Sequence, residues 1–241
     1  MFPAASITIP FEGQIASAVR VMPDTPPREA LEALRLPPYA GMVVMHGGAS
    51  KMTPEQIDTV RPLLTSVLAP LAEERRWLVV DGGTHAGAMA AMGEARRAIG
   101  GTFPLLGACP AGLIAYPGGP EPDDEHVPLD PWHSHFLFVD GDEFGIESDL
   151  LVGLLRAAEQ PGVALIVNGG ELVYHEALLH ARLGNPLVIV AGTGRVADEI
   201  AAPNSERRKA MPPGAPLHIV SLEQMDEFAH LLDRLLAVTG S

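Results

Sequence analysis

The sequence is poor in cysteine, in lysine and in long hydrophobic runs, and each shortage excludes a class of protein. Its 241 residues include one cysteine, Cys109, which excludes an internal disulfide and favours a reducing compartment. No run of 18 or more apolar residues is present, so the sequence predicts no transmembrane helix. The first residues lack the basic region and apolar block of a secretory signal. We therefore expect a cytoplasmic protein with no membrane partner.

Positive charge is also scarce. Two lysines and 14 arginines are outnumbered by 30 acidic residues, which gives a net charge of −14. Because affinity for nucleic acids comes largely from neutralising phosphates, we expect no nucleic-acid partner. A small anionic ligand stays compatible with this charge, since backbone N–H groups at helix N-termini hold anions without help from net charge.

Hydrophobic runs bounded by glycine or proline alternate with helical patterns along most of the chain. The runs are mostly continuous, which is typical of parallel strands buried on both faces. Strands are expected at 41–48, 77–83, 103–109, 135–141, 162–170, 186–194 and 216–220, and helices at 54–75, 86–99, 146–159, 171–183, 195–201 and 222–238. The alternation predicts an α/β fold, with a Rossmann-like, doubly wound, mostly parallel sheet flanked by helices.

The segments outside this alternation suggest one domain over 1–241, in which 1–38 form an N-terminal β extension and a short helix. Residues 6–21 resemble a hairpin or an edge addition to the sheet. Residues 116–134, rich in proline and acidic side chains, form a long loop, and such loops are usually functional or mobile. The apolar stripe of 222–238 packs against the sheet or a second subunit, and we expect a homo-oligomer, specifically a dimer.

Four glycine-rich turns follow expected strands and indicate a ligand site. In an open parallel sheet the carboxyl ends of all strands share one edge, and ligands bind there where the strand order reverses. Glycine lets the backbone approach a phosphate or ribose, and the next helix offers free N–H groups. The alternative is that these are ordinary tight turns. The expected ligand contacts in the turns are Gly47, Gly48, Gly82, Gly83, Thr84, His85, Gly87, Gly169, Gly170, Glu171, Gly192, Thr193, Gly194 and Arg195.

Other motifs narrow the chemistry. None of the turns is G-x-G-x-x-G or a Walker motif, and no G-x-S-x-G elbow exists, so the sequence predicts no such cofactor site or hydrolase. His133 and His135 share a strand face, but no recognisable set of further ligands accompanies them, so we expect no metal. Glu147 either binds a ribose hydroxyl or complements a helix N-terminus. Cys109 is interpreted as a packed small residue.

Several of these stretches together resemble the SLOG superfamily, in the branch that forms the N-terminal region of TRPM ion channels and has free-standing prokaryotic relatives (LSDAT). The most specific are "GGTHAGAM", "LDPWHSHFLFVD" and "GTGRVADEIA". The resemblance implies a domain that senses a nucleotide such as ADP-ribose, with Arg195 as the main cation. It also implies a second arginine near 149–151, where this chain has Asp149, Leu150 and Leu151.

The same superfamily contains the LOG enzymes, which hydrolyse the N-glycosidic bond of nucleoside monophosphates and carry the signature P-G-G-x-G-T-x-x-E. The corresponding stretch here is "NGGELVYHE", which keeps Glu176 but has Leu172 and Val173 in place of Gly-Thr. Three hypotheses stay open. The first is a nucleotide-binding protein, and the second is a LOG-like hydrolase with Glu176 as its catalytic residue. The third is a structural dimer module whose crevice no longer binds.

Overall fold

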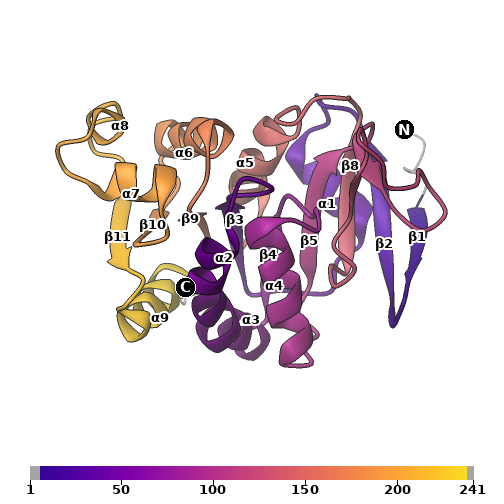
Figure 1. Ribbon diagram of the computed structural model, residues 1–241, viewed down its shortest axis with the longest axis horizontal. Helices are drawn as coiled ribbons and strands as arrows, with labels where there is room; N and C mark the ends of the chain where they lie inside the picture. The colour runs from indigo at the N-terminus through magenta and orange to yellow at the C-terminus, as the bar shows by residue number, and fades with distance from the viewer. Residues whose placement is uncertain (1–5, 238–241) are drawn as a thin grey trace.

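The computed structural model describes residues 6–237, in which nine strands form one sheet between two layers of helices (Figure 1). The strands are β1 (Ser6–Phe11), β2 (Gln14–Val21), β3 (Gly41–Gly47), β4 (Trp77–Asp81), β5 (Leu105–Pro110), β8 (His135–Val139), β9 (Gly162–Val167), β10 (Leu187–Ala191) and β11 (Leu217–Ser221). The helices are α1 (Pro27–Leu34), α2 (Pro54–Leu63), η1 (Leu64–Leu68), α3 (Ala69–Arg75), α4 (Gly87–Ala98), α5 (Ser148–Ala157), α6 (Glu171–Leu183), α7 (Arg195–Ala201), α8 (Glu206–Lys209) and α9 (Met225–Leu235). Val238, the expected end of the last helix, lies outside the described residues.

The strand order is β1-β2-β8-β5-β4-β3-β9-β10-β11. Every neighbouring pair is parallel except β1 with β2. The chain first builds β3, β4, β5 and β8 in one direction and then returns to place β9 beside β3. The strand order therefore reverses between β3 and β9, which confirms the doubly wound, mostly parallel sheet predicted from the sequence.

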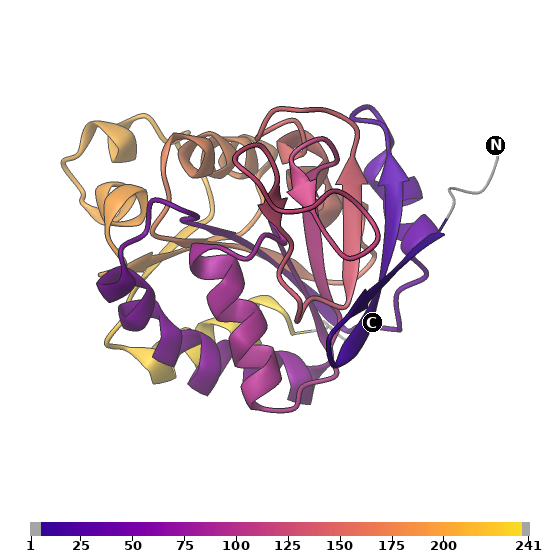
Figure 2. The same ribbon diagram turned by 45° about the vertical axis from the view of Figure 1, so that its right-hand side comes forward.

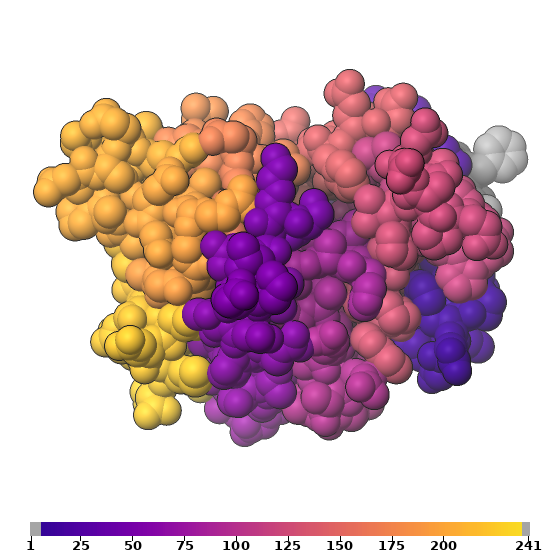
Figure 3. Space-filling view, viewed as in Figure 1, coloured from indigo at the N-terminus to yellow at the C-terminus, as the bar shows by residue number. Residues whose placement is uncertain are grey.

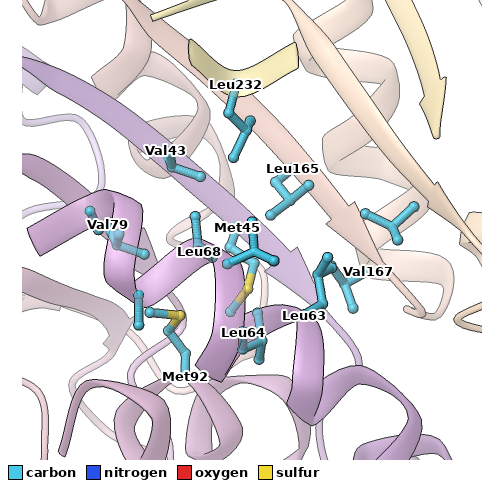
Figure 4. Packing of buried hydrophobic residues seen from close by; sticks show 14 of the residues in the cluster. Val43, Met45, Leu63, Leu64, Leu68, Val79, Met92, Leu165, Val167 and Leu232 are labelled. Atoms are coloured by element: carbon cyan, nitrogen blue, oxygen red, sulfur yellow. The ribbon is translucent and has the colours of Figure 1, made fainter. Parts of the chain in front are cut away.

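Both faces of the sheet are covered, which explains the continuous hydrophobic runs. Along β3, Val43 and Met45 pack on one face with residues of α2, η1, α3, α4 and α9 (Figure 4). Met42 and Val44 pack on the other face with residues of α1, α5, α6 and α7. The apolar stripe of α9 is used on the first face, where Phe228 is fully buried, so it packs against the sheet.

The helix expected at 54–75 begins as predicted and changes type in the middle. Thr53 caps it, because the Thr53 Oγ1 accepts from the Gln56 N–H and the Gln56 side chain accepts from the Thr53 N–H. A π-helical segment, η1, separates α2 from α3. It lies between Pro62 and Pro70, two residues that have no N–H for the α-helical hydrogen-bond ladder.

The N-terminal segment is both a hairpin and an edge addition. β1 pairs antiparallel with β2, and β2 pairs parallel with β8, as the right-hand edge in Figure 2 shows. The long loop at 116–134 is anchored at its end: β7 (Val127–Pro128) pairs with β6 (Ile114–Ala115), and Leu129 forms a bridge with Thr84. Among residues 6–237, no helix combines the length and the apolar character needed to cross a membrane.

Candidate functional site

A cavity of about 620 Å³ opens at the carboxyl ends of the strands, beside the point where their order reverses. All four glycine-rich turns contribute to its wall, as the sequence predicts. In Figure 3 the purple segment that follows β3 rises between the orange and the pink parts of the surface. The expected site residues that line the cavity are Gly47, Gly48, Gly82, Thr84, Glu147, Gly169, Gly170, Glu171, Glu176 and Arg195.

Two glycines of the turn after β4 lie behind the wall, where packing explains them. A Cβ on Gly83 would stand 2.7 Å from the Gly107 Cα on the neighbouring strand. A Cβ on Gly87 would stand 2.7 Å from the Ala49 carbonyl oxygen and closer still to that of Gly48. Both glycines also have positive φ, +70° and +52°. Here the bare turn is required because two neighbouring segments of backbone touch it.

The turn after β10 is also satisfied by the protein itself. Asp198, in the first turn of α7, accepts hydrogen bonds from the N–H groups of Gly192 (2.6 Å) and Gly194 (3.1 Å). The Thr193 hydroxyl donates to the Val190 carbonyl at 2.7 Å and accepts from the Asn168 N–H at 2.8 Å. These three expected contacts do not line the cavity: Gly192 and Gly194 bond to the start of α7, and Thr193 connects the turns after β9 and β10.

Arg195 projects from this turn into the cavity. Its backbone has positive φ (+53°), and so has that of Asn168 (+58°), whose side-chain oxygen lies 3.5 Å from Arg195 Nη1. A Cβ on Gly170 would stand 2.7 Å from Arg195 Nη2, so the guanidinium lies directly on Gly170. Within residues 6–237, no carboxylate pairs with this guanidinium. Arg195 is therefore a cation available to an anionic ligand.

Glu176 is held by a chain of buried hydrogen bonds under the cavity floor. Asn185 Nδ2 donates to His180 Nδ1 at 2.9 Å, which leaves the proton of His180 on Nε2. His180 Nε2 then donates to His46 Nε2 at 2.8 Å, and His46 Nδ1 donates to Glu176 Oε2 at 2.8 Å. Ser148 Oγ donates to the other carboxylate oxygen at 2.8 Å.

The protonation states follow from this chain. Burial lowers the pKa of His180 to about 2, so His180 is neutral. Burial alone would raise the pKa of Glu176, but the hydrogen bonds that its carboxylate accepts from His46 and Ser148 outweigh burial and lower the pKa. Glu176 is thus an ionised carboxylate, 5% exposed, on the cavity wall.

Glu147 is the opposite case on the same wall. Burial, helped by the nearby Glu176 carboxylate, raises the pKa of Glu147 to about 7, although hydrogen bonds from backbone N–H groups oppose the shift. One of these comes from the Gly145 N–H, 2.9 Å from Glu147 Oε2. Two carboxyl groups with pKa values moved in opposite directions therefore line one cavity, an arrangement typical of acid–base sites.

A second buried network joins the turn after β4 to the long loop. His133 donates from Nε2 to Asp81 (2.8 Å) and from Nδ1 to Asp130 (3.0 Å), and the second oxygen of Asp130 pairs with His85 at 2.9 Å. Burial would lower the pKa of His133, but the two aspartates raise it to about 9. His85, an expected ligand contact, is directed to this network and does not line the cavity.

His133 and His135 are the two histidines that the sequence offers as possible metal ligands. His133 uses both ring nitrogens for aspartates, and His135 Nδ1 lies 2.9 Å from Ser134 Oγ. Within the described part of the chain, no three His, Cys, Asp or Glu side chains gather in a way that would hold a metal ion.

Sequence reasoning missed several residues of the wall. Lys51, Phe144, Glu199 and Arg207 line the cavity together with His46. Arg207 lies on α8, a four-residue helix too short to show a periodic pattern. The signal that would have found it is a cluster of three basic residues, 207–209, in an acidic chain.

Comparisons with known proteins agree with this architecture. The mouse and rat (Mus musculus and Rattus norvegicus) transient receptor potential cation channel subfamily M member 2 are each 29% identical over a match covering 56% of this chain. The match covers 11% of the length of those channels.

Two solved structures are similar in fold. The X-ray structure of the structural-genomics target TM1055 superimposes with a TM-score of 0.58 at 21% identity, covering 80% of this chain and 99% of that one. The molybdenum cofactor binding protein from the phototrophic bacterium Rippkaea orientalis gives 0.52 at 14% identity, with 81% and 98% covered. The family model described as "SLOG in TRPM, prokaryote" matches residues 40–230, most of the sheet and the whole cavity wall. The chain therefore belongs to this family, the prokaryotic form of SLOG in TRPM.

Proposed function

We propose that this protein is a cytoplasmic sensor that binds an NAD-derived or related nucleotide, such as ADP-ribose, in the cavity at the strand ends. The observation that carries the proposal is Arg195, a guanidinium without a carboxylate partner among the described residues, placed on the glycine turn that begins α6. A helix N-terminus and an arginine together make a site for phosphate oxygens. The homodimer expected from the sequence stays a prediction.

The experiment is calorimetric titration of the purified protein with ADP-ribose, NAD and AMP. We expect at least one to bind, and Arg195→Ala to weaken it about 10-fold or more, because a charge-assisted hydrogen bond contributes roughly 1.5–3 kcal/mol. Arg182→Ala is the matched control, since Arg182 is exposed on α6 and does not line the cavity. Equal affinities of the Arg195→Ala and Arg182→Ala variants would refute the role of Arg195.

A second candidate function, hydrolysis of a nucleotide N-glycosidic bond, is favoured by the two carboxyl groups. The protonated Glu147 would give its proton to the leaving nitrogen as the bond to the sugar breaks. The ionised Glu176 would take a proton from the attacking water, whose oxygen forms the new bond to the sugar carbon. Against it stand Leu172 and Val173, where LOG enzymes have Gly-Thr.

Chromatography of AMP, NAD and ADP-ribose after incubation with the protein separates the two functions. A hydrolase releases free base from at least one of them, and both Glu147→Gln and Glu176→Gln abolish the release. A sensor returns all three nucleotides unchanged at enzyme concentrations that saturate binding.

A further inference from the structure

Arg207 brings a cation to the cavity from outside the four glycine turns. Its Nη1 donates to Glu171 Oε2 at 3.2 Å, its Nη2 pairs with the other oxygen of Glu171, and its Nε pairs with Glu199. The guanidinium carbon lies 4.3 Å from the centre of the Tyr174 ring. Arg207, Glu171 and Glu199 line the cavity that Arg195 enters, and Tyr174 does not.

This arrangement fixes the orientation of Arg207 without using all its donors. A guanidinium has five N–H groups, and the contacts with Glu171 and Glu199 use three of them. One N–H on each terminal nitrogen stays without a partner among residues 6–237. The guanidinium also lies over the Tyr174 ring, a cation–π contact that helps to keep it at the cavity wall.

The present partners of Arg207 hold it weakly. The side chains of Glu171 and Glu199 are 82% and 50% exposed, and exposed ion pairs are screened by water and salt. A phosphate accepts a guanidinium in a bidentate geometry and carries comparable or greater charge. An anionic ligand in the cavity can therefore replace one carboxylate as the partner of Arg207.

The charges of the cavity wall determine which ligands need this exchange of partners. Its cations are Lys51, Arg195 and Arg207, and its carboxyl groups are those of Glu147, Glu171, Glu176 and Glu199. Arg195 can receive one phosphate with no competing carboxylate. A second phosphate must either do without an arginine or bind Arg207, whose present partners are Glu171 and Glu199.

We propose that Arg207 is the second phosphate-binding cation of the cavity and that Glu171 and Glu199 hold it in place until a ligand displaces one of them. The site then favours a nucleotide with two linked phosphates over a nucleoside monophosphate. This inference rests on the proposed nucleotide-binding function. It gives that site a second arginine at a position different from 149–151, where the resemblance placed one.

The test is calorimetric titration with ADP-ribose and AMP of the wild type, Arg207→Ala, Glu199→Gln and Lys209→Ala. We expect Arg207→Ala to weaken ADP-ribose binding about 10-fold or more, and AMP binding less than about 3-fold. Glu199→Gln should strengthen ADP-ribose binding, because it removes a competitor. Lys209→Ala, which removes the same charge from α8 outside the cavity, should leave both affinities unchanged.

The test is decisive because Arg207→Ala and Glu199→Gln are expected to change the affinity for ADP-ribose in opposite directions. If the Arg207–Glu199 pair only stabilises the fold, Arg207→Ala and Glu199→Gln break the same contact and change affinity in the same direction, which overturns the proposal. Should Arg207→Ala fail to fold by circular dichroism, Arg207→Lys keeps the charge and loses the fork, and an affinity for ADP-ribose equal to the wild type also overturns it. Wild-type binding that depends on Arg195 but not on Arg207 refutes this inference alone. Absence of binding by the wild type refutes the proposed function as well.

Discussion

Replacing Gly87 by alanine tests whether a bare turn is required by packing. Gly87 has a φ of +52°, and a methyl group there would meet the backbone oxygens of Gly48 and Ala49. Positive φ costs alanine about 1–2 kcal/mol, and overpacking against fixed backbone adds about 1–3 kcal/mol. We therefore expect Gly87→Ala to reduce the free energy of unfolding by about 2–5 kcal/mol.

Gly100 provides a matched control for this substitution. Its φ of +62° is close to that of Gly87, but an added Cβ there has nothing within 4 Å. Gly100→Ala should therefore cost only the conformational part, about 1–2 kcal/mol. Urea unfolding followed by circular dichroism measures both variants. Equal losses at the two positions would refute the claim that the turns after β3 and β4 press on each other.

Three further predictions use the same unfolding assay or the titration. Gly82→Ala should be nearly neutral for stability, because its Cβ would approach nothing closer than 3.8 Å, yet it should weaken nucleotide binding, since the methyl enters the cavity wall; normal affinity contradicts this. Between about pH 4.5 and 7 the unfolded chain releases the Glu147 proton before the folded protein does, so stability should fall with rising pH by at most about 3 kcal/mol, and Glu147→Gln should remove that slope. The pKa of His133 is raised, so its contribution to the free energy of unfolding is complete below about pH 6.5 and is lost as pH rises toward 9. His133→Gln should therefore flatten the dependence of stability on pH in this interval. An unchanged slope would show that His133 is not an imidazolium in the folded protein.

The sequence predicts the sheet well because each core strand is buried on both faces. The run at β3 is apolar on consecutive residues, and its glycine boundary marks where the strand ends. Alternation with helices then requires parallel strands and right-handed crossovers. The strand order itself depends on long-range pairing, such as β3 with β9, which no local pattern encodes. The π-helical segment and the two-residue strands β6 and β7 are likewise too short to leave a periodic signal.

The parts of the candidate site formed by neighbouring residues could be predicted from the sequence, and the contacts between residues distant in the sequence could not. Glycine turns after strands predict a shared edge, and each of the four turns contributes at least one residue to the wall of one cavity. The contact between His46 and His180 joins residues 134 positions apart. Arg207 likewise reaches Glu171 across 36 positions. Such pairs depend on how α6 and α8 pack, which sequence spacing does not reveal.

The buried chain from Asn185 to Glu176 argues for a function of the cavity independently of any ligand. Polar and ionised groups in a core give little net stability compared with apolar packing of the same volume. Away from this chain and from the network around His133, the core is largely apolar, and both faces of the sheet are filled by apolar side chains. A buried chain of two histidines that ends on a carboxylate therefore stabilises the fold less than apolar side chains of the same volume would. It lies under the one edge where the strand order reverses and ends on the cavity wall, where its effect is to keep Glu176 ionised and fixed. The same reasoning predicts that the double variant Asn185→Leu, His180→Leu still folds. In this variant Glu176 is no longer held in place, and its pKa is no longer lowered, by the chain.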